Sequence, residues 1–312
     1  MKLIKNKKGM FFTLMSIMLL TIFIASLSYS MSYKERDNMF IIETRVRTIN
    51  NFIDNLEQDL QRGIKISATR ALIGIQDYMA QTGDFLNDSQ TGFEEALVNG
   101  SVEGYGLNLT AGSSLNDWIQ KIQAQAEKVN IIIDMNIADF SAEHTDPWNI
   151  NISTNISFNV SDSNNIASWQ FNKQISLLFN VIGFEDPIYF IKSYGKVARQ
   201  IIPTNFTSWG IGNLKSHLIS RTYRAYSGAP SFLMRLEGNL SSSPYGIETI
   251  VDTDEFVTYG IPIIERSSVD YIYWGSQPTT DYNIHNITDS GWSEFKLDQE
   301  HVTSYDVEAY KY

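Results

Sequence analysis

The chain of 312 residues has no cysteine, only four histidines and no proline before Pro147. Without cysteine it can form no disulfide framework, thiol nucleophile or cysteine-ligated metal site. Without an early proline, nothing forces a helix in the first 146 residues to break. Acidic residues outnumber basic ones by 35 to 24. This balance argues against a nucleic-acid-binding protein, which usually presents a basic face.

Charge is also missing from one long stretch, because no charged residue occurs between Gly9 and Tyr33. As a helix, its apolar core at residues 10–30 would be about 31 Å long, enough to cross a bilayer. The nine residues before it carry four positive charges and no acid. Because the net charge of the whole chain is −11, residues 10–312 carry a net charge of −15. The positive-inside rule therefore predicts a cytoplasmic N-terminus, with the residues after the span outside the cytoplasmic membrane.

Three interpretations of this segment remain open. A cleaved secretory signal would exit at Ser26-Leu27-Ser28, although such signals usually have an apolar region of only about 7–15 residues. An uncleaved signal anchor would keep the whole segment. In the third interpretation, Lys7-Lys8-Gly9 directly before the apolar run resembles the leader (class III signal peptide) of type IV pilins and archaeal pilin-like surface proteins.

The resemblance implies how the N-terminus is processed. In that family a prepilin peptidase cuts after the glycine, and the apolar helix stays on the mature subunit. The processing residues would be Lys7, Lys8, Gly9 and Met10, the partners a prepilin-peptidase-like enzyme and the membrane, and the product a homo-oligomer or filament. Many bacterial pilins have a glutamate five residues into the mature chain, where this sequence has Leu14. The archaeal leader pattern is looser, so the resemblance is nearer to the archaeal proteins.

A second, amphipathic helix is predicted to follow the apolar one without interruption. From Ile42 onward, apolar residues recur at steps of three and four, as on one face of a helix. The pattern continues to about Ala80, and residues 81–84 form the expected stop. Gly63 and Gly74 each cost about 1 kcal/mol relative to alanine, which allows a bend or short break near either.

The region after this helix combines strand patterns with acceptor sites for N-glycosylation. Nine Asn-x-Ser/Thr sequons occur, all beyond the apolar segment: Asn87, Asn99, Asn108, Asn151, Asn155, Asn159, Asn205, Asn239 and Asn286. Residues 149–160 alternate between apolar and polar side chains, as in a half-buried strand. Three of the sequon asparagines would then project from one face about 13 Å apart. An asparagine- and serine-rich composition would be the simpler explanation of the sequons.

Neighbouring patterns predict an antiparallel sheet with a helix on one side. A capping box at Ser114–Asp117 starts the helix, and alternating segments at 131–138 and 169–181 give two further strands. Beyond residue 183 the pattern is weaker: a helix at 214–226, strands at 248–262 and 269–274, and a short helix capped by Asp298. The expected fold class is α+β, with a long N-terminal helix followed by a β-rich ectodomain.

Motifs for chemistry are weak. The sequence predicts no catalytic residue, no metal site and no cofactor, since it has no metal-protease histidine pair, nucleophile elbow or phosphate loop. Asp252, Asp254 and Glu255 could offer oxygens to Ca²⁺, but they lack the rest of an EF-hand loop. One aromatic cluster could form a sugar-binding platform or simply pack in a core: Tyr271, Tyr273, Trp274, Tyr282 and Trp292.

Four segments result: a basic cytoplasmic leader at 1–9, an apolar transmembrane or pilin-like helix at 10–30, an amphipathic helix at 31–82 and an extracellular β-rich domain at 83–312. The expected function is a pilin-like, membrane-anchored or filament-forming surface glycoprotein with a structural or adhesive role. The alternative is an anchored ectodomain that binds a solute or glycan and never polymerises. A surface hydrolase has the least support from the sequence.

Overall fold

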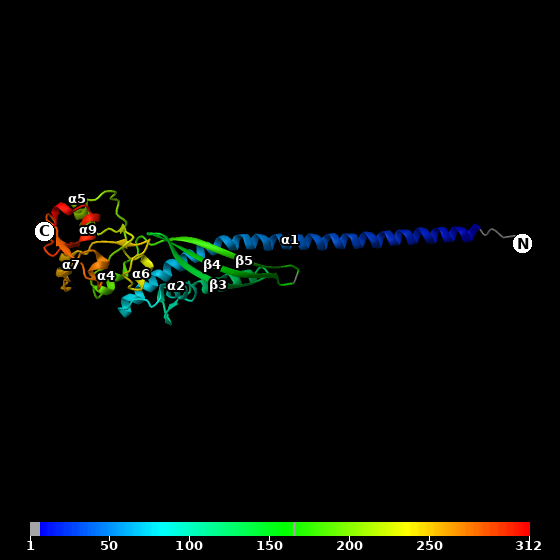
Figure 1. Ribbon diagram of the computed structural model, residues 1–312. Helices are drawn as coiled ribbons and strands as arrows, with labels where there is room; N and C mark the ends of the chain where they lie inside the picture. Colours follow the sequence, from blue (N-terminus) through cyan, green and yellow to red (C-terminus); the bar gives the residue numbers. More distant parts are fainter. Residues whose placement is uncertain (1–6, 165) are drawn as a thin grey trace.

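The computed structural model describes residues 7–164 and 166–312, without the side chains of residues 7–10 and 32–38. It has an α+β fold in which one long helix leads into a mixed helical and stranded head (Figure 1). The start of α1 and the C-terminus lie at opposite ends of the elongated molecule (Figure 1). The predicted fold class is therefore confirmed.

Helix α1 runs unbroken from Lys7 to Thr82, 76 residues or about 114 Å. Its end near Ala80 was predicted, and the structure confirms it. Gly83 follows with φ of +75°, a left-handed conformation that favours glycine, and donates its N–H to the Met79 carbonyl at 2.9 Å. From Ile49 onward, one face of α1 is buried against the head.

The two glycines within α1 do not interrupt the helix, so the break allowed at Gly63 or Gly74 does not occur. Instead they are sites of close approach. A Cβ at Gly63 would lie 3.0 Å from the Trp118 ring, and one at Gly74 would lie 2.9 Å from Leu107. The glycines let two side chains of the head pack directly on the helix backbone.

The main sheet consists of strands β3 (Ile131–Asp146), β4 (Asn149–Asp162) and β5 (Ser168–Asn180), antiparallel in the order β3-β4-β5. The predicted alternation is confirmed, because every second residue of β4 from Ile150 onward is buried. That buried face shares one hydrophobic core with Leu60 and its neighbours on α1.

Two helices complete the core beside α1. Helix α2 (Ser89–Val98) contacts both α1 and β3. Helix α3 (Leu115–Glu127) starts with the predicted capping box, in which Ser114 and Asp117 bond each other's backbone N–H groups. Between them lie the short elements β1 (Ser101–Val102), β2 (Tyr105–Gly106) and η1 (Asn108–Thr110).

Residues 183–312, called the distal region below, are built from short elements around two additional cores. In chain order these are α4 (Pro187–Lys192), α5 (Ile211–Ser220), β6 (Arg224–Ala225), α6 (Phe232–Leu236), β7 (Ile247–Glu248), α7 (Thr253–Thr258), α8 (Asp270–Tyr273), β8 (Asp281–Asn283), η2 (Thr288–Ser290), β9 (Lys296–Asp298), α9 (Gln299–Ser304) and η3 (Glu308–Tyr310). Strand β6 pairs with β7 and β8 pairs with β9.

Three sequence predictions in the distal region need correction. The helix at 214–226 is α5, which ends at Ser220 because Arg221 takes a left-handed φ of +57°. The strand predicted at 248–262 is wrong beyond Glu248, since Asp252 caps helix α7. The strand predicted at 269–274 is helix α8. The short helix capped by Asp298 is confirmed as α9.

Candidate functional site

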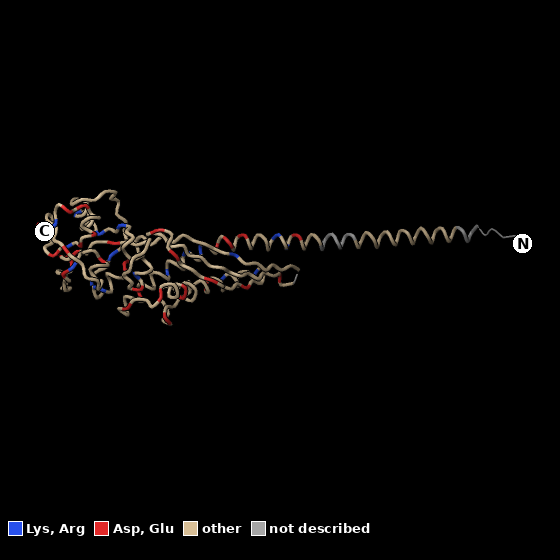
Figure 2. Tube along the Cα trace, viewed as in Figure 1, with Lys and Arg blue, Asp and Glu red and all other residues tan. Residues whose placement is uncertain are grey.

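The most exposed apolar surface of the molecule is the first part of α1. Residues Phe11–Met31 form a helical stretch of 21 residues with a mean hydropathy of 2.2, none of it buried. Figure 2 shows no charged residue along it, whereas charges are spread over the head. Within the described residues, this is the one helix long and apolar enough to be a membrane anchor or a signal sequence.

The predicted processing residues lie where α1 begins. The helix starts at Lys7, but the structure describes only the backbone of Lys7, Lys8, Gly9 and Met10. Leu14, at the place of the bacterial glutamate, is 64% exposed. Processing at Gly9 therefore stays a prediction.

An ion pair fastens α1 to the end of the sheet where the helix leaves the head. Arg45 donates to Asp162 with an Nε–Oδ1 distance of 2.6 Å, and also to the backbone carbonyls of Val129 and Asn130. The hydrogen bond from Arg45 holds the pKa of Asp162 below its usual range. A second pair, Lys173–Glu57 at 2.8 Å, joins β5 to α1. Sequence reasoning missed both pairs, because their partners are more than 100 residues apart.

The nine sequon asparagines all lie at or near the surface. Seven are exposed, and Asn151 and Asn155 on the central strand β4 are half-buried. Asn151, Asn155 and Asn159 share the face of β4 opposite the buried side chains, as predicted. Attachment of glycans to them stays a prediction.

The distal region contains a fully buried charged cluster around Arg235. Its guanidinium Nη1 lies 2.5 Å from Asp186 Oδ2 and 2.8 Å from Asp270 Oδ2, and all three side chains are buried. Tyr223 also donates to Asp186 at 2.9 Å. Burial raises the pKa of Asp270 to about 6, although the charge of Arg235 acts in the opposite direction.

A second buried cluster centres on His301. Its ring nitrogens lie 2.8 Å from Asp298 Oδ2 and 3.0 Å from Glu248 Oε2, and Arg224 contacts the other oxygen of Glu248 at 2.6 Å. Burial alone would lower the pKa of His301, but the two carboxylates outweigh it and raise the pKa to about 9. Neither His301 nor Glu248 has exposed surface where a substrate could meet it. The geometry therefore supports a structural role.

Two of the three Ca²⁺ ligands considered from the sequence have other partners. Asp252 caps α7 and accepts from the Trp292 indole at 3.0 Å, and Glu255 pairs with Arg199 and Arg221. Among the described residues, no group of three or more histidines, aspartates or glutamates is arranged to hold a metal ion.

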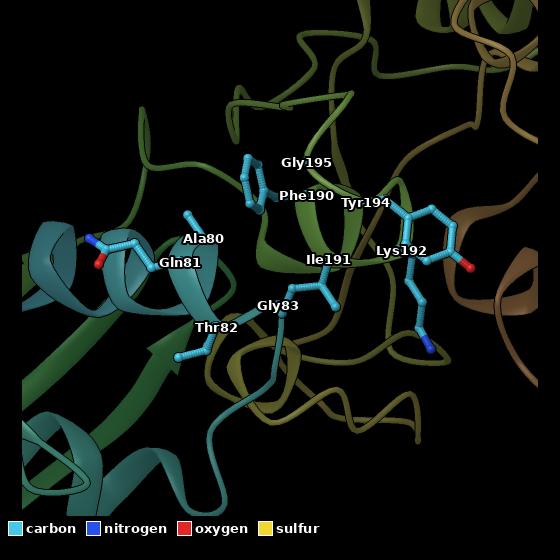
Figure 3. A pocket seen from close by; sticks show the side chains of 9 residues that line it. All are labelled: Ala80, Gln81, Thr82, Gly83, Phe190, Ile191, Lys192, Tyr194 and Gly195. Carbon is cyan, nitrogen blue, oxygen red and sulfur yellow. The ribbon is translucent and has the colours of Figure 1, made fainter.

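A surface cavity of about 450 Å³ lies beside the end of α1 (Figure 3). Residues 80–83 form one side, and α4 with the loop after it forms the other, including Phe190, Ile191 and Tyr194. Among the described residues, Lys192 is the one charged residue of the lining, and no carboxylate lines it. This composition offers no acid–base pair for hydrolysis.

The aromatic residues considered as a sugar platform do not form one surface. Tyr271 and Trp274 line a second cavity of about 610 Å³. Tyr273 is buried in the core beside Phe256, while Tyr282 and Trp292 pack on the other distal core. The structure thus brings two of the five to one accessible site.

The candidate functional features of the chain are therefore an exposed apolar helix, a head joined to its second half by ion pairs, surface sequons and a cavity lined by two aromatic residues. We compared the chain with known proteins by family, by sequence and by structure. No family model, no curated protein and no solved structure matches it.

Proposed function

We propose that this protein is a pilin-like surface protein of the cytoplasmic membrane, with its head outside the cell and a structural or adhesive role. The observation that supports this most is the division of α1. Its first part is apolar and unburied, so that it needs lipid or other helices around it, and its second part is packed on an antiparallel sheet.

N-terminal sequencing of the protein from its native cells tests the processing step. A mature chain that starts at Met10 supports the proposal, and an intact Met1 removes it. Replacing the glycine at the predicted cut, Gly9→Leu, should leave Met1 in place. Lys2→Gln, which changes the leader away from the cut, should be processed like the unaltered chain.

The second candidate is a membrane-anchored binding ectodomain that does not polymerise. The cavity lined by Tyr271 and Trp274 favours it, because accessible aromatic side chains in a concave site commonly contact ligands. Electron microscopy of filaments sheared from the cell surface distinguishes the two. Filaments that contain this chain support the pilin-like candidate, and its absence from them supports the anchored receptor.

Glycosylation of the head is part of the proposal, since an exported chain presents its sequons to the glycosylation machinery. The exposed Asn159 should carry a glycan in the native protein, together with its neighbours Asn151 and Asn155 on the same face. Glycopeptide mass spectrometry checks all three, and finding them unmodified would remove this part of the proposal.

A further inference from the structure

The second cavity has an unusual lining for so acidic a protein. It opens between the loop after α6 and the segment after α8, with a volume of about 610 Å³. Its lining includes two aromatic residues, several residues with hydroxyl or amide groups and one lysine, Lys192. The Tyr271 hydroxyl also lies 3.5 Å from the buried His301 Nε2. None of the aspartates and glutamates that the structure describes lines it, although the chain has 35 acidic residues.

The position of Trp274 in the lining is fixed by other aromatic residues. Trp274 is the C-cap of α8, and its ring packs edge-on against Tyr189 at 4.6 Å and against Tyr273 at 5.6 Å between centroids. The residue is only half-buried, so part of it faces the cavity. Its indole N–H has no hydrogen-bond partner within the described part of the chain and is free to donate to a ligand.

The rim of the cavity is also fixed. The guanidinium of Arg266 donates to the backbone carbonyls of Gly275 and Gln277, which holds the loop after α8. A Cβ at Gly275 would lie 2.7 Å from the carbonyl oxygen of Tyr271, so only glycine fits there. The cavity is therefore formed before any ligand arrives, which lowers the entropic cost of binding.

Lys192 gives the cavity lining a positive charge. It lies at the end of α4, is exposed, and has its ammonium 5.7 Å from the centroid of the Phe85 ring. It makes no ion pair with any other described residue. With no carboxylate in the lining to neutralise it, the lysine can bind an anionic group of a ligand through a charge-assisted hydrogen bond.

We propose that this cavity binds a carboxylated saccharide, such as a uronic acid unit of a surface polysaccharide. Trp274 and Tyr271 would contact the apolar face of the sugar ring, Ser276, Gln277 and Thr279 its hydroxyl groups, and Lys192 its carboxylate. The inference deepens the adhesive role proposed above and rests on display of the head at the cell surface.

The test compares two ligands that differ only in the charged group, methyl glucuronide and methyl glucoside. The full chain is titrated in a detergent without a sugar head group, and binding is followed by ligand-observed nuclear magnetic resonance. The chain is produced in a host without N-glycosylation, because Asn239 is both a sequon and part of the lining.

We expect the glucuronide to bind more tightly than the glucoside. Lys192→Gln should weaken glucuronide binding about tenfold and leave glucoside binding unchanged, the size expected for one charge-assisted hydrogen bond. Lys196→Gln is the matched control, because this exposed lysine of the same segment does not line the cavity. Trp274→Phe, which keeps a ring and removes the N–H, should weaken binding of both ligands.

Absence of glucuronide binding, equal affinity for the two ligands, or wild-type affinity in Lys192→Gln would each overturn the inference. None of these outcomes affects the start of the mature chain or the presence of filaments. Failed sugar binding with processing at Met10 intact therefore removes the inference alone, and bound sugar with an intact Met1 removes the pilin-like proposal alone.

Discussion

Arg235 has no exposed surface, yet it keeps its charge because two carboxylates contact its guanidinium. Burial opposes a charge on any side chain, and close opposite charges restore it. The same balance explains His301 between Glu248 and Asp298. At the residue scale, the distal region thus depends on a few buried ionic contacts in addition to its small apolar cores.

Replacing the buried cation should destabilise the head strongly. Arg235→Met leaves Asp186 and Asp270 buried without their counter-charge, and we expect the free energy of unfolding to fall by about 3–5 kcal/mol. Arg62→Met is the control, because Arg62 is 77% exposed and its pair with Asp59 is long, at 3.6 Å. Its effect should stay below about 1 kcal/mol in denaturant unfolding. Equal losses in the two variants would contradict the role assigned to Arg235.

His301 should make stability depend on pH above neutrality. Its pKa is raised to about 9 in the folded chain, against about 6.5 in an unfolded one, so the stabilisation is complete below pH 6.5 and is lost as the pH rises through 9. The free energy of unfolding should fall by about 3 kcal/mol over this window. Thermal unfolding at several pH values checks it. The decline should largely disappear in His301→Gln and persist in His285→Gln, which changes an exposed histidine.

At the scale of elements, sequence patterns predicted the helices and strands that bury one side of a long amphipathic repeat. The three-and-four spacing from Ile42 gave α1 its predicted end, and the strict alternation in residues 149–160 predicted β4. The distal elements are short and depend on contacts between distant residues, such as Glu248 with His301, which no local pattern reveals. The cavity near Trp274 was half predicted: its aromatic residues were considered from the sequence, but its lysine and rim were not.

The close packing at Gly63 predicts an effect opposite to helix propensity. Alanine favours a helix over glycine by about 1 kcal/mol, but at this position its Cβ would crowd the Trp118 ring. We expect Gly63→Ala to lower the free energy of unfolding by about 1 kcal/mol. Gly212→Ala, in helix α5 with open space around the new Cβ, should instead raise it by about 0.5–1 kcal/mol. A gain in both variants would show that Trp118 does not constrain α1.

At the scale of the whole molecule, charge and hydrophobicity follow the long axis. The apolar part of α1 extends from a head that carries the charged side chains, and the C-terminus lies at the end remote from it (Figure 2). If the chain is anchored as proposed, this arrangement would give it one polarity across the membrane, with the basic leader on one side and the head on the other.

The absence of cysteine makes this orientation directly testable. A single thiol introduced at the exposed Ser227, as Ser227→Cys, should react with a membrane-impermeant maleimide on intact cells. The unaltered chain, which has no thiol, measures the background. Labelling that requires permeabilised cells would place the head in the cytoplasm and contradict the proposed topology.

Helix α1 runs without a break from its apolar part into the head, so in an anchored chain it would act as a rigid arm. Between Met31 and Thr82 the helix extends about 76 Å at the usual rise per residue. Membrane-spanning helices tilt by about 20° on average, and such a tilt would carry the far end of this arm sideways by about 26 Å. In a chain anchored as proposed, small changes at the membrane would sweep the head across a distance comparable to the diameter of a small domain. The area around the anchor that the distal region can reach would then depend on the tilt of α1 in the bilayer.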